Sequence, residues 1–196
     1  MALRGSGDAT RRHVLAAAAD IVAVEGAAKL TLDAVAERVG LSKGGILHHF
    51  ATKDSLIAAM IDDVTAQFEL DLHRHMQGES GPGSFARAFL RACLDPDGAL
   101  TRTLRVSAGI VAAVAINNQL LAPLRRRYDV WRGLLENDGI DPAIAELVRS
   151  AADGLWLGNV LELGPTSVAL RKRMFAKLIE LTQLGVAPVR APKSRA

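Results

Sequence analysis

Apolar residues along this chain recur at intervals of three and four residues, the spacing that places them on one face of an α-helix. Val14, Ala18, Ile21 and Val22 form the first such stripe. No segment combines strict alternation with β-branched or aromatic enrichment, so we expect no sheet. The fold class is therefore expected to be all-α. The pattern predicts helices over residues 9–24, 32–39, 43–50, 53–76, 84–94, 100–116, 119–137, 142–163 and 167–185.

Two short helices near the N-terminus have the spacing of a helix-turn-helix, because only Gly40-Leu41-Ser42 separates them. Gly40 can adopt a positive φ without a Cβ clash, and Thr31 and Ser42 are placed to cap the two helices. Two helices of about eight residues cannot hold a core alone, so the helix over residues 9–24 is expected to cover them from behind.

The second of these helices is a poor structural helix, because it opens with Lys43-Gly44-Gly45. Each glycine costs about 1 kcal/mol relative to alanine. Two glycines are useful where the backbone must approach another surface closely, such as a DNA strand. Between Ser42 and Lys53 there are two lysines and no acidic residue. This combination favours DNA binding over a solvated surface helix.

The composition is compatible with a DNA-binding protein without requiring one. The chain has 196 residues, 49% of them hydrophobic and 23% charged, which excludes a disordered protein. The net charge of +3 permits a nucleic-acid partner. No apolar run approaches the about 20 residues that a membrane span needs, and no secretory signal is evident. The single cysteine, Cys93, cannot form an internal disulfide, so a cytoplasmic protein with no membrane partner is expected.

Residues 11–57 resemble the DNA-binding domain of the TetR family of repressors. The resemblance rests on Arg11-x-x-Val-Leu-x-Ala-Ala, Gly26, Thr31-Leu-x-x-Val-Ala, Gly40-Leu-Ser-Lys-Gly, His49-Phe and Lys53-Asp-x-Leu. It implies a DNA-binding domain over residues 1–54 and a helical ligand-binding and dimerisation domain over residues 55–196. It also implies a homodimer that releases double-stranded operator DNA when a small molecule enters the C-terminal core.

The resemblance also assigns roles to single residues. Thr31, Lys43, Gly45, His49 and Lys53 would contact the DNA backbone, and His48 would face the groove. Leu47 stands where the family usually has a tyrosine, so it either contacts a thymine methyl group or a sugar, or packs inward. The full candidate DNA-binding set is Thr31, Ser42, Lys43, Gly44, Gly45, Leu47, His48, His49 and Lys53.

Motifs of enzymes and metal sites are weak in this sequence. Residues 40–44 fit G-x-S-x-G, but a nucleophile elbow needs a strand before Ser42, and a helix is predicted there. Glu69 with His73, and Asp71 with His75, are spaced to share a cation, but a solvated helix face near a helix end is the favoured interpretation. We therefore expect no enzymatic activity, no cofactor and no metal.

In the TetR family the last two long helices of two subunits form a four-helix bundle. Ser150, Gly154 and Gly158 lie on one helix face and would permit a close approach; packing within one subunit is the alternative. Asp153 on the same helix is open to a structural, a dimer or a ligand role. The candidate dimer seam comprises Leu147, Ala151, Gly154, Leu155, Gly158, Leu161 and Phe175.

A ligand pocket is expected between the middle helices. No charged residue clearly points inward, which favours an apolar or aromatic effector. The candidate lining comprises Phe68, Phe89, Cys93, Leu104, Ile110, Val114, Trp131 and Trp156. The resulting hypothesis is a ligand-responsive, homodimeric transcriptional repressor that binds a near-palindromic operator. The alternative is a small helical ligand-binding protein or enzyme on the same scaffold that no longer binds DNA.

Overall fold

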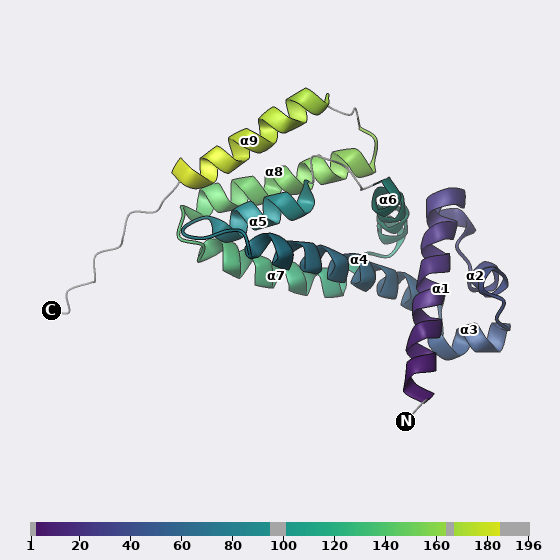
Figure 1. The fold of residues 1–196 in the computed structure, drawn as a ribbon. Helices are drawn as coiled ribbons and strands as arrows, with labels where there is room; N and C mark the ends of the chain where they lie inside the picture. The colour runs from purple at the N-terminus through teal and green to yellow at the C-terminus, as the bar shows by residue number, and fades with distance from the viewer. Residues whose placement is uncertain (1–2, 95–100, 164–166, 185–196) are drawn as a thin grey trace. The chain divides into compact units, whose positions relative to one another are not determined.

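Helices account for nearly all of the chain that the computed structural model describes, namely residues 3–94, 101–163 and 167–184, with the side chains of 3–6, 101–105 and 116 outside this description. These ranges contain no β-strand, so the all-α prediction is confirmed. None of their helices is long and apolar enough to cross a membrane. The elements are α1 (Leu3–Glu25), η1 (Ala27–Lys29), α2 (Leu32–Val39), α3 (Lys43–His49), α4 (Lys53–Met76), α5 (Ser84–Cys93), α6 (Thr101–Ile116), η2 (Asn118–Leu121), α7 (Ala122–Glu136), α8 (Pro142–Val160) and α9 (Val168–Leu184) (Figure 1).

Three helix ends differ from the sequence prediction by three residues or more: the starts of α1 and α7 and the end of α8. Helix α1 begins at Leu3, six residues before the predicted start at residue 9. Helix α7 begins at Ala122, because residues 118–121 form the 3-10 helix η2. Helix α8 ends at Val160 because the Leu163 N–H donates to the Gly158 carbonyl, 3.1 Å away, while Glu162 adopts a left-handed φ of 51°. This closure usually uses glycine, which is why the sequence indicated an end near Gly164.

The described residues pack into two compact units. The first comprises residues 3–67 and 101–127, and the second comprises residues 68–94, 128–163 and 167–184. Helices α4 and α7 are therefore each divided between the units. The units describe packing, so the predicted functional division at residue 54 remains a prediction.

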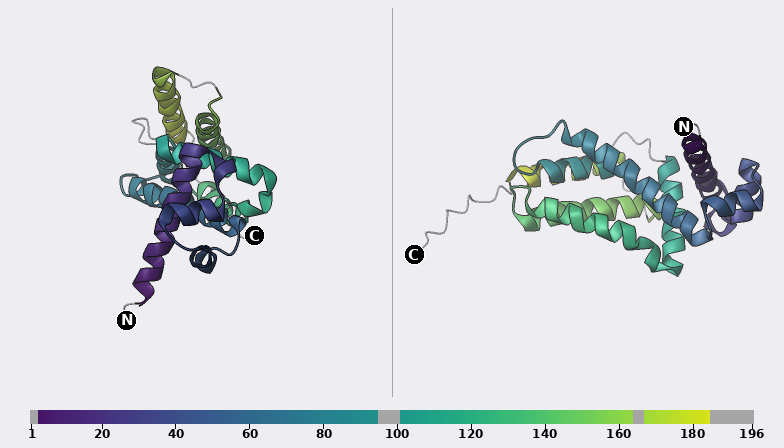
Figure 2. Two further views of the ribbon diagram at one scale, coloured as in Figure 1. Left: turned by 90° about the vertical axis from the view of Figure 1, so that its right-hand side faces the viewer. Right: turned by 90° about the horizontal axis from the view of Figure 1, so that it is seen from below.

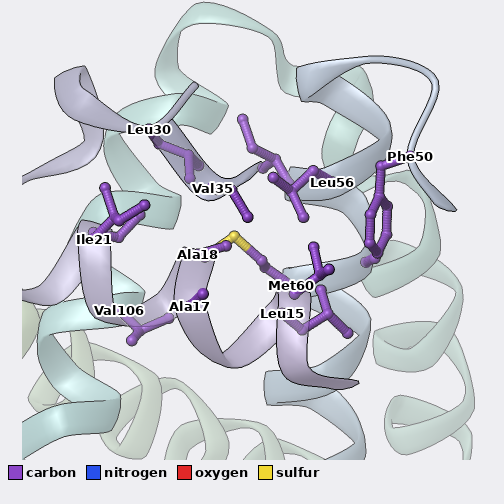
Figure 3. Packing of buried hydrophobic residues seen from close by; sticks show 14 of the residues in the cluster. Leu15, Ala17, Ala18, Ile21, Leu30, Val35, Phe50, Leu56, Met60 and Val106 are labelled. Atoms are coloured by element: carbon purple, nitrogen blue, oxygen red, sulfur yellow. The ribbon is translucent and has the colours of Figure 1, made fainter. Parts of the chain in front are cut away.

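The core of the first unit forms around α1. Its inward stripe meets Val35 of α2, Leu56 and Met60 of α4, and Val106 of α6, all buried (Figure 3). Helices α2 and α3 lie beside α1 in both views of Figure 2. The short helices α2 and α3 are held in place because the apolar faces of α1 and α4 complete a core that α2 and α3 cannot form alone.

Helix α5 is the most buried helix of the second unit, and it packs against α8 and α9. Phe89 of α5 meets Phe68 of α4 and Trp131 of α7, with ring centroids 5.3 and 5.8 Å from Phe89. Asp138, from the loop after α7, caps α5 by accepting from the backbone N–H groups of Phe85 at 2.9 Å and Ala86 at 2.8 Å. The unit is thus built around an aromatic centre and a helix cap supplied from a distant part of the chain.

Candidate nucleic-acid interface

The turn between α2 and α3 is fixed by caps at both ends. The Thr31 Oγ1 accepts from the Ala34 N–H at 3.0 Å and so begins α2. Gly40 ends α2 with a φ of 68°, as its place in the motif predicts. The Leu41 N–H donates back to the Ala36 carbonyl, 3.0 Å away. Ser42 Oγ then accepts from the Gly45 N–H at 3.2 Å and begins α3.

The inner face of α3 is anchored in the core of the first unit. Ile46 is fully buried and Phe50, at the end of the helix, is nearly so. The guanidinium of Arg11 in α1 lies over the Phe50 ring, 5.2 Å from its centroid. This packing fixes the orientation of α3. The face of α3 opposite Ile46 is therefore the one that points away from the core.

The outer face of α3 consists of Lys43, Gly44, Leu47 and His48, which are all exposed. Leu47 is 41% exposed, so it does not pack inward, and one of the alternatives for this residue is removed. His49 is half-buried and meets His48 edge to face, with centroids 5.4 Å apart. The sequence-predicted residues of α3 therefore fall on one surface, except that Gly45 and His49 lie at its margin.

The fold itself does not require the two glycines of α3. Neither has a positive φ. A Cβ on Gly44 would have the Ser42 Oγ at 3.9 Å as its nearest neighbour, and a Cβ on Gly45 would meet the same atom at 3.5 Å. Both are ordinary contact distances. Alanine would therefore fit at either place and favour the helix, so packing among the described residues does not explain the two glycines.

The positive charge at this surface is partly balanced by an acid that the sequence window from Ser42 to Lys53 does not contain. The Lys43 Nζ lies 3.1 Å from Oδ1 of Asp33, on α2. Both side chains are largely exposed, and such pairs contribute about 0–1 kcal/mol, so Lys43 can still reach a phosphate. Lys53, at the start of α4, is exposed as well.

Thr31 and Ser42 are exposed, and both hydroxyl groups act as helix caps. In this bond each hydroxyl oxygen accepts, so its O–H remains able to donate to a phosphate oxygen. The two predicted roles of these residues are thus compatible with each other.

Contacts from far along the chain hold this surface, and the sequence analysis missed them. The Asn117 Nδ2 donates to Oδ2 of Asp54 at 2.9 Å, which joins the segment after α6 to the first turn of α4. Gly109 of α6 lies against Val22 of α1. The one signal in the sequence for the contact with Val22 was the presence of Gly109 within an apolar helix. Nothing in the local sequence indicates the hydrogen bond between Asn117 and Asp54.

The enzyme-like motifs take other roles. The residues before Ser42 form helix α2 instead of a strand, and the serine oxygen serves as a cap. Asp71 accepts from Arg74 at 2.8 Å. Within the described residues, no three His, Cys, Asp or Glu side chains are grouped to hold a metal ion.

The family models match both parts of the chain. A model of the bacterial regulatory proteins of the tetR family matches residues 14–60, which include the whole surface just described. A model of the tetracyclin repressor-like C-terminal domain matches residues 83–183, more than half of the 196 residues. The chain belongs to the TetR family of transcriptional regulators.

Several solved structures have a similar fold. A transcriptional regulator from Rhodococcus sp. Rha1 is 26% identical, with a TM-score of 0.73 over 91% of this chain and 99% of that one. The multidrug binding protein EbrR complexed with ethidium is 21% identical, with a TM-score of 0.65 over 86% and 97%. A regulator from Saccharomonospora viridis in complex with choline is 19% identical, with a TM-score of 0.66 over 88% and 96%. No curated protein sequence matches the chain.

The candidate pocket residues of this TetR-family chain are distributed over both compact units. Phe68, Phe89 and Trp131 form one aromatic cluster in the second unit, where Cys93 is buried and Trp156 is half-buried. Ile110 and Val114 belong to the first unit, in which Val114 is buried in the core. The side chain of Leu104 lies outside the described residues. The pocket therefore remains a prediction.

A polar network that sequence reasoning did not resolve lies next to the aromatic cluster. The Tyr128 hydroxyl donates to Oδ1 of Asp153 at 3.1 Å, and Arg149 pairs with both Asp153 and Glu146. Burial raises the pKa of Asp153, against the opposing effect of Arg149. Burial likewise raises the pKa of the Tyr128 hydroxyl and of the Cys93 thiol. Asp153 is thus already hydrogen-bonded within the chain.

Five of the candidate seam residues lie on α8, Leu161 is its C-cap, and Phe175 lies on α9. Leu147 on α8 is 53% exposed and Leu161 at its C-cap is 42% exposed. Leu157 of α8, which the sequence analysis omitted, is 40% exposed. A Cβ on Gly154 or Gly158 would meet no described residue within 4 Å, apart from the chain neighbours and the backbone of the helix itself. Ala151, Leu155 and Phe175 are half-buried, and the Phe175 ring lies beneath Arg91 of α5.

Proposed function

We propose that this TetR-family regulator is a ligand-responsive repressor. A homodimer binds near-palindromic operator DNA through the outer face of α3 and dissociates from it when a small apolar or aromatic effector binds. The contacts to the DNA are those of the candidate set: Thr31, Ser42, Lys43, Gly44, Gly45, Leu47, His48, His49 and Lys53.

The observation that carries the proposal is the pair of glycines in α3. Alanine at Gly44 or Gly45 would meet only ordinary contacts, so the chain retains two destabilising residues without an internal reason. The glycines lie on a helix whose inner face is packed and whose caps fix its direction. A helix presented in this way is suited to enter a major groove and to bring its backbone close to a DNA strand.

The outward side of α8 supports the homodimer. Leu147, Leu157 and Leu161 are exposed there, and the two glycines between them leave room for another helix. The vacant space at both glycines argues against close packing within one subunit as their purpose. Two subunits joined through this surface would present two α3 helices to successive major grooves, about 34 Å apart.

The aromatic cluster of the second unit supports an apolar or aromatic effector. Phe68, Phe89 and Trp131 supply aromatic edges and faces within 5.0 to 5.8 Å of one another. Tyr128 stacks beside Trp131, and the acid that its hydroxyl contacts, Asp153, is also engaged by Arg149. An effector that binds at this cluster would contact aromatic rings, and the charge beside them is already paired. This favours planar hydrophobic ligands.

The second candidate function is a helical ligand-binding protein or enzyme that has lost DNA binding. Leu47 is the observation that favours it, because leucine cannot donate to a phosphate where the family usually has a tyrosine hydroxyl. The two functions differ in their salt dependence, since binding to DNA releases counterions and pocket binding of an uncharged ligand does not.

A gel-shift titration separates the two functions. The full chain is titrated onto duplex DNA from upstream of its own coding sequence at several salt concentrations. A repressor gives a Kd below about 10⁻⁸ M and a linear fall of log K with log salt. The repressor is refuted if every upstream segment is bound only in the non-specific range of about 10⁻⁴ to 10⁻⁶ M. Release by hydrophobic planar compounds, tested next on the same complex, addresses the effector.

A further inference from the structure

We propose that Leu47 is a specificity-determining residue that selects a thymine in each operator half-site by packing on the C5-methyl group. The proposal rests on the proposed function, because it requires α3 to lie in the major groove. It goes further by naming the base that one position of the operator contains.

Leu47 lies in the middle of the outer face of α3. Lys43 precedes it by one helical turn, and His48 follows it directly. Within this helix, whose residues are all described, Ile46 is fully buried, which leaves Leu47 as the one exposed apolar side chain. The face thus has two polar positions flanking a single aliphatic one.

The chemistry of base edges then restricts what Leu47 can meet. In the major groove, guanine, adenine and cytosine present hydrogen-bond donors and acceptors, whereas thymine adds a methyl group. Leucine opposite a polar edge removes water from donors or acceptors and offers no partner in return. Opposite thymine, the same side chain buries one methyl group against another. The favourable partner is therefore thymine.

Gly44 leaves the space that this contact needs. It is exposed one turn before Leu47 on the same face, and a Cβ there would meet only Ser42 Oγ, at 3.9 Å. Among the described residues other than its chain neighbours, only Ser42 therefore lies within 4 Å of the space in front of Gly44. A projecting methyl group can enter beside the leucine while the backbone lies close to the DNA.

The test removes one methyl group from the DNA and one side chain from the protein. Operators are first selected from a random duplex library with the wild-type chain, and each thymine of the selected site is then replaced in turn by uracil, which lacks only the methyl group. At one position in each half-site the replacement should weaken wild-type binding about fourfold, or about fifteenfold when both half-sites carry it. The Leu47→Ala variant should bind thymine and uracil sites equally at that position.

A matched variant at the neighbouring position provides the control. His48→Ala should change other base preferences and retain the uracil penalty. The proposal is overturned if no uracil replacement weakens wild-type binding, or if Leu47→Ala retains the full penalty. Circular dichroism verifies that each variant is folded, as expected for exposed positions. If wild-type protein selects no sequence at all, the proposed function fails and the thymine contact fails with it; a selected site without a uracil effect refutes the thymine contact alone.

Discussion

Gly109 of α6 is packed so closely against Val22 of α1 that a Cβ on the glycine would overlap with the Val22 Cγ1. Valine in a helix has one strongly preferred rotamer, so it cannot easily turn aside. Gly109→Ala should therefore force the two helices apart and lower the free energy of unfolding by about 1–3 kcal/mol. Urea titration followed by circular dichroism measures this loss.

A second substitution identifies the cause of that loss. Val22→Ala removes the Cγ atoms, so the double variant Val22→Ala, Gly109→Ala should be more stable than the two separate losses predict. Additive losses would mean that the two residues do not oppose each other, and that Gly109 is needed for a different reason.

Replacing a glycine of α3 by alanine should stabilise the fold and weaken DNA binding. Gly44→Ala should raise the free energy of unfolding by about 0.5–1 kcal/mol, because alanine favours the helix and fits in this space. The same variant should bind operator DNA at least tenfold more weakly, because its methyl group lies between backbone and DNA. Gly133→Ala on α7, where a Cβ also meets nothing within 4 Å, is the control that should gain stability and bind normally. Normal DNA binding by Gly44→Ala would contradict the close approach.

The helix-turn-helix could be predicted from the sequence because its signals are local. Gly40, Thr31 and Ser42 each act within four residues of their own position, and the apolar stripe of α1 repeats with the helical period. Asp138 could not be assigned in the same way. It caps α5 from more than 50 residues away, and nothing in the neighbourhood of either segment indicates that pairing. The end of α8 was misplaced because Glu162 takes a conformation that usually requires glycine.

The lysines at the interface give a prediction that depends on salt. Lys43→Ala and Lys53→Ala should each lower the slope of log K against log salt by about 1 and weaken binding to all sequences similarly. Asp33→Asn should have the opposite effect and strengthen non-specific binding, because it removes the acid 3.1 Å from Lys43. Lys177→Ala on α9, paired with Glu180, should leave the slope unchanged. A slope that is the same in all of these proteins would exclude both lysines from the interface.

Glu79 should make the stability depend on pH in the acidic range. Burial alone would raise its pKa, but hydrogen bonds from Arg87 and Arg91 outweigh burial and hold the pKa below the ordinary value of 4.5. A carboxyl group with a lowered pKa stabilises the fold above its unfolded pKa, and this contribution disappears as the pH falls through the folded pKa. Glu79→Gln should therefore reduce the free energy of unfolding by about 2–3 kcal/mol at pH 7.

The difference between wild type and Glu79→Gln should shrink as the pH is lowered from about 5 to 3, since protonation then removes the same charge in the wild type. Glu180→Gln, which breaks an exposed pair with Lys177, is the matched control and should change little at any pH. A constant difference between wild type and Glu79→Gln across this range would show that the charge of Glu79 is not what stabilises the loop before α5.

The dimer surface gives the last prediction, because operator affinity should depend on a residue far from the DNA-binding helix. At Gly158 no described residue lies within 4 Å of an added Cβ, so the first atom of a larger side chain is accommodated in the isolated chain. Gly158→Arg places a charge where a second α8 is proposed to pack. The variant should keep its helical circular dichroism, sediment as a monomer at micromolar concentration and bind DNA only in the non-specific range of about 10⁻⁴ to 10⁻⁶ M. Gly133→Arg, at a similarly open position on α7, should remain dimeric and bind the operator. A dimeric Gly158→Arg variant with normal binding would place the seam elsewhere, whereas a variant that unfolds would mean that Gly158 serves packing within one subunit.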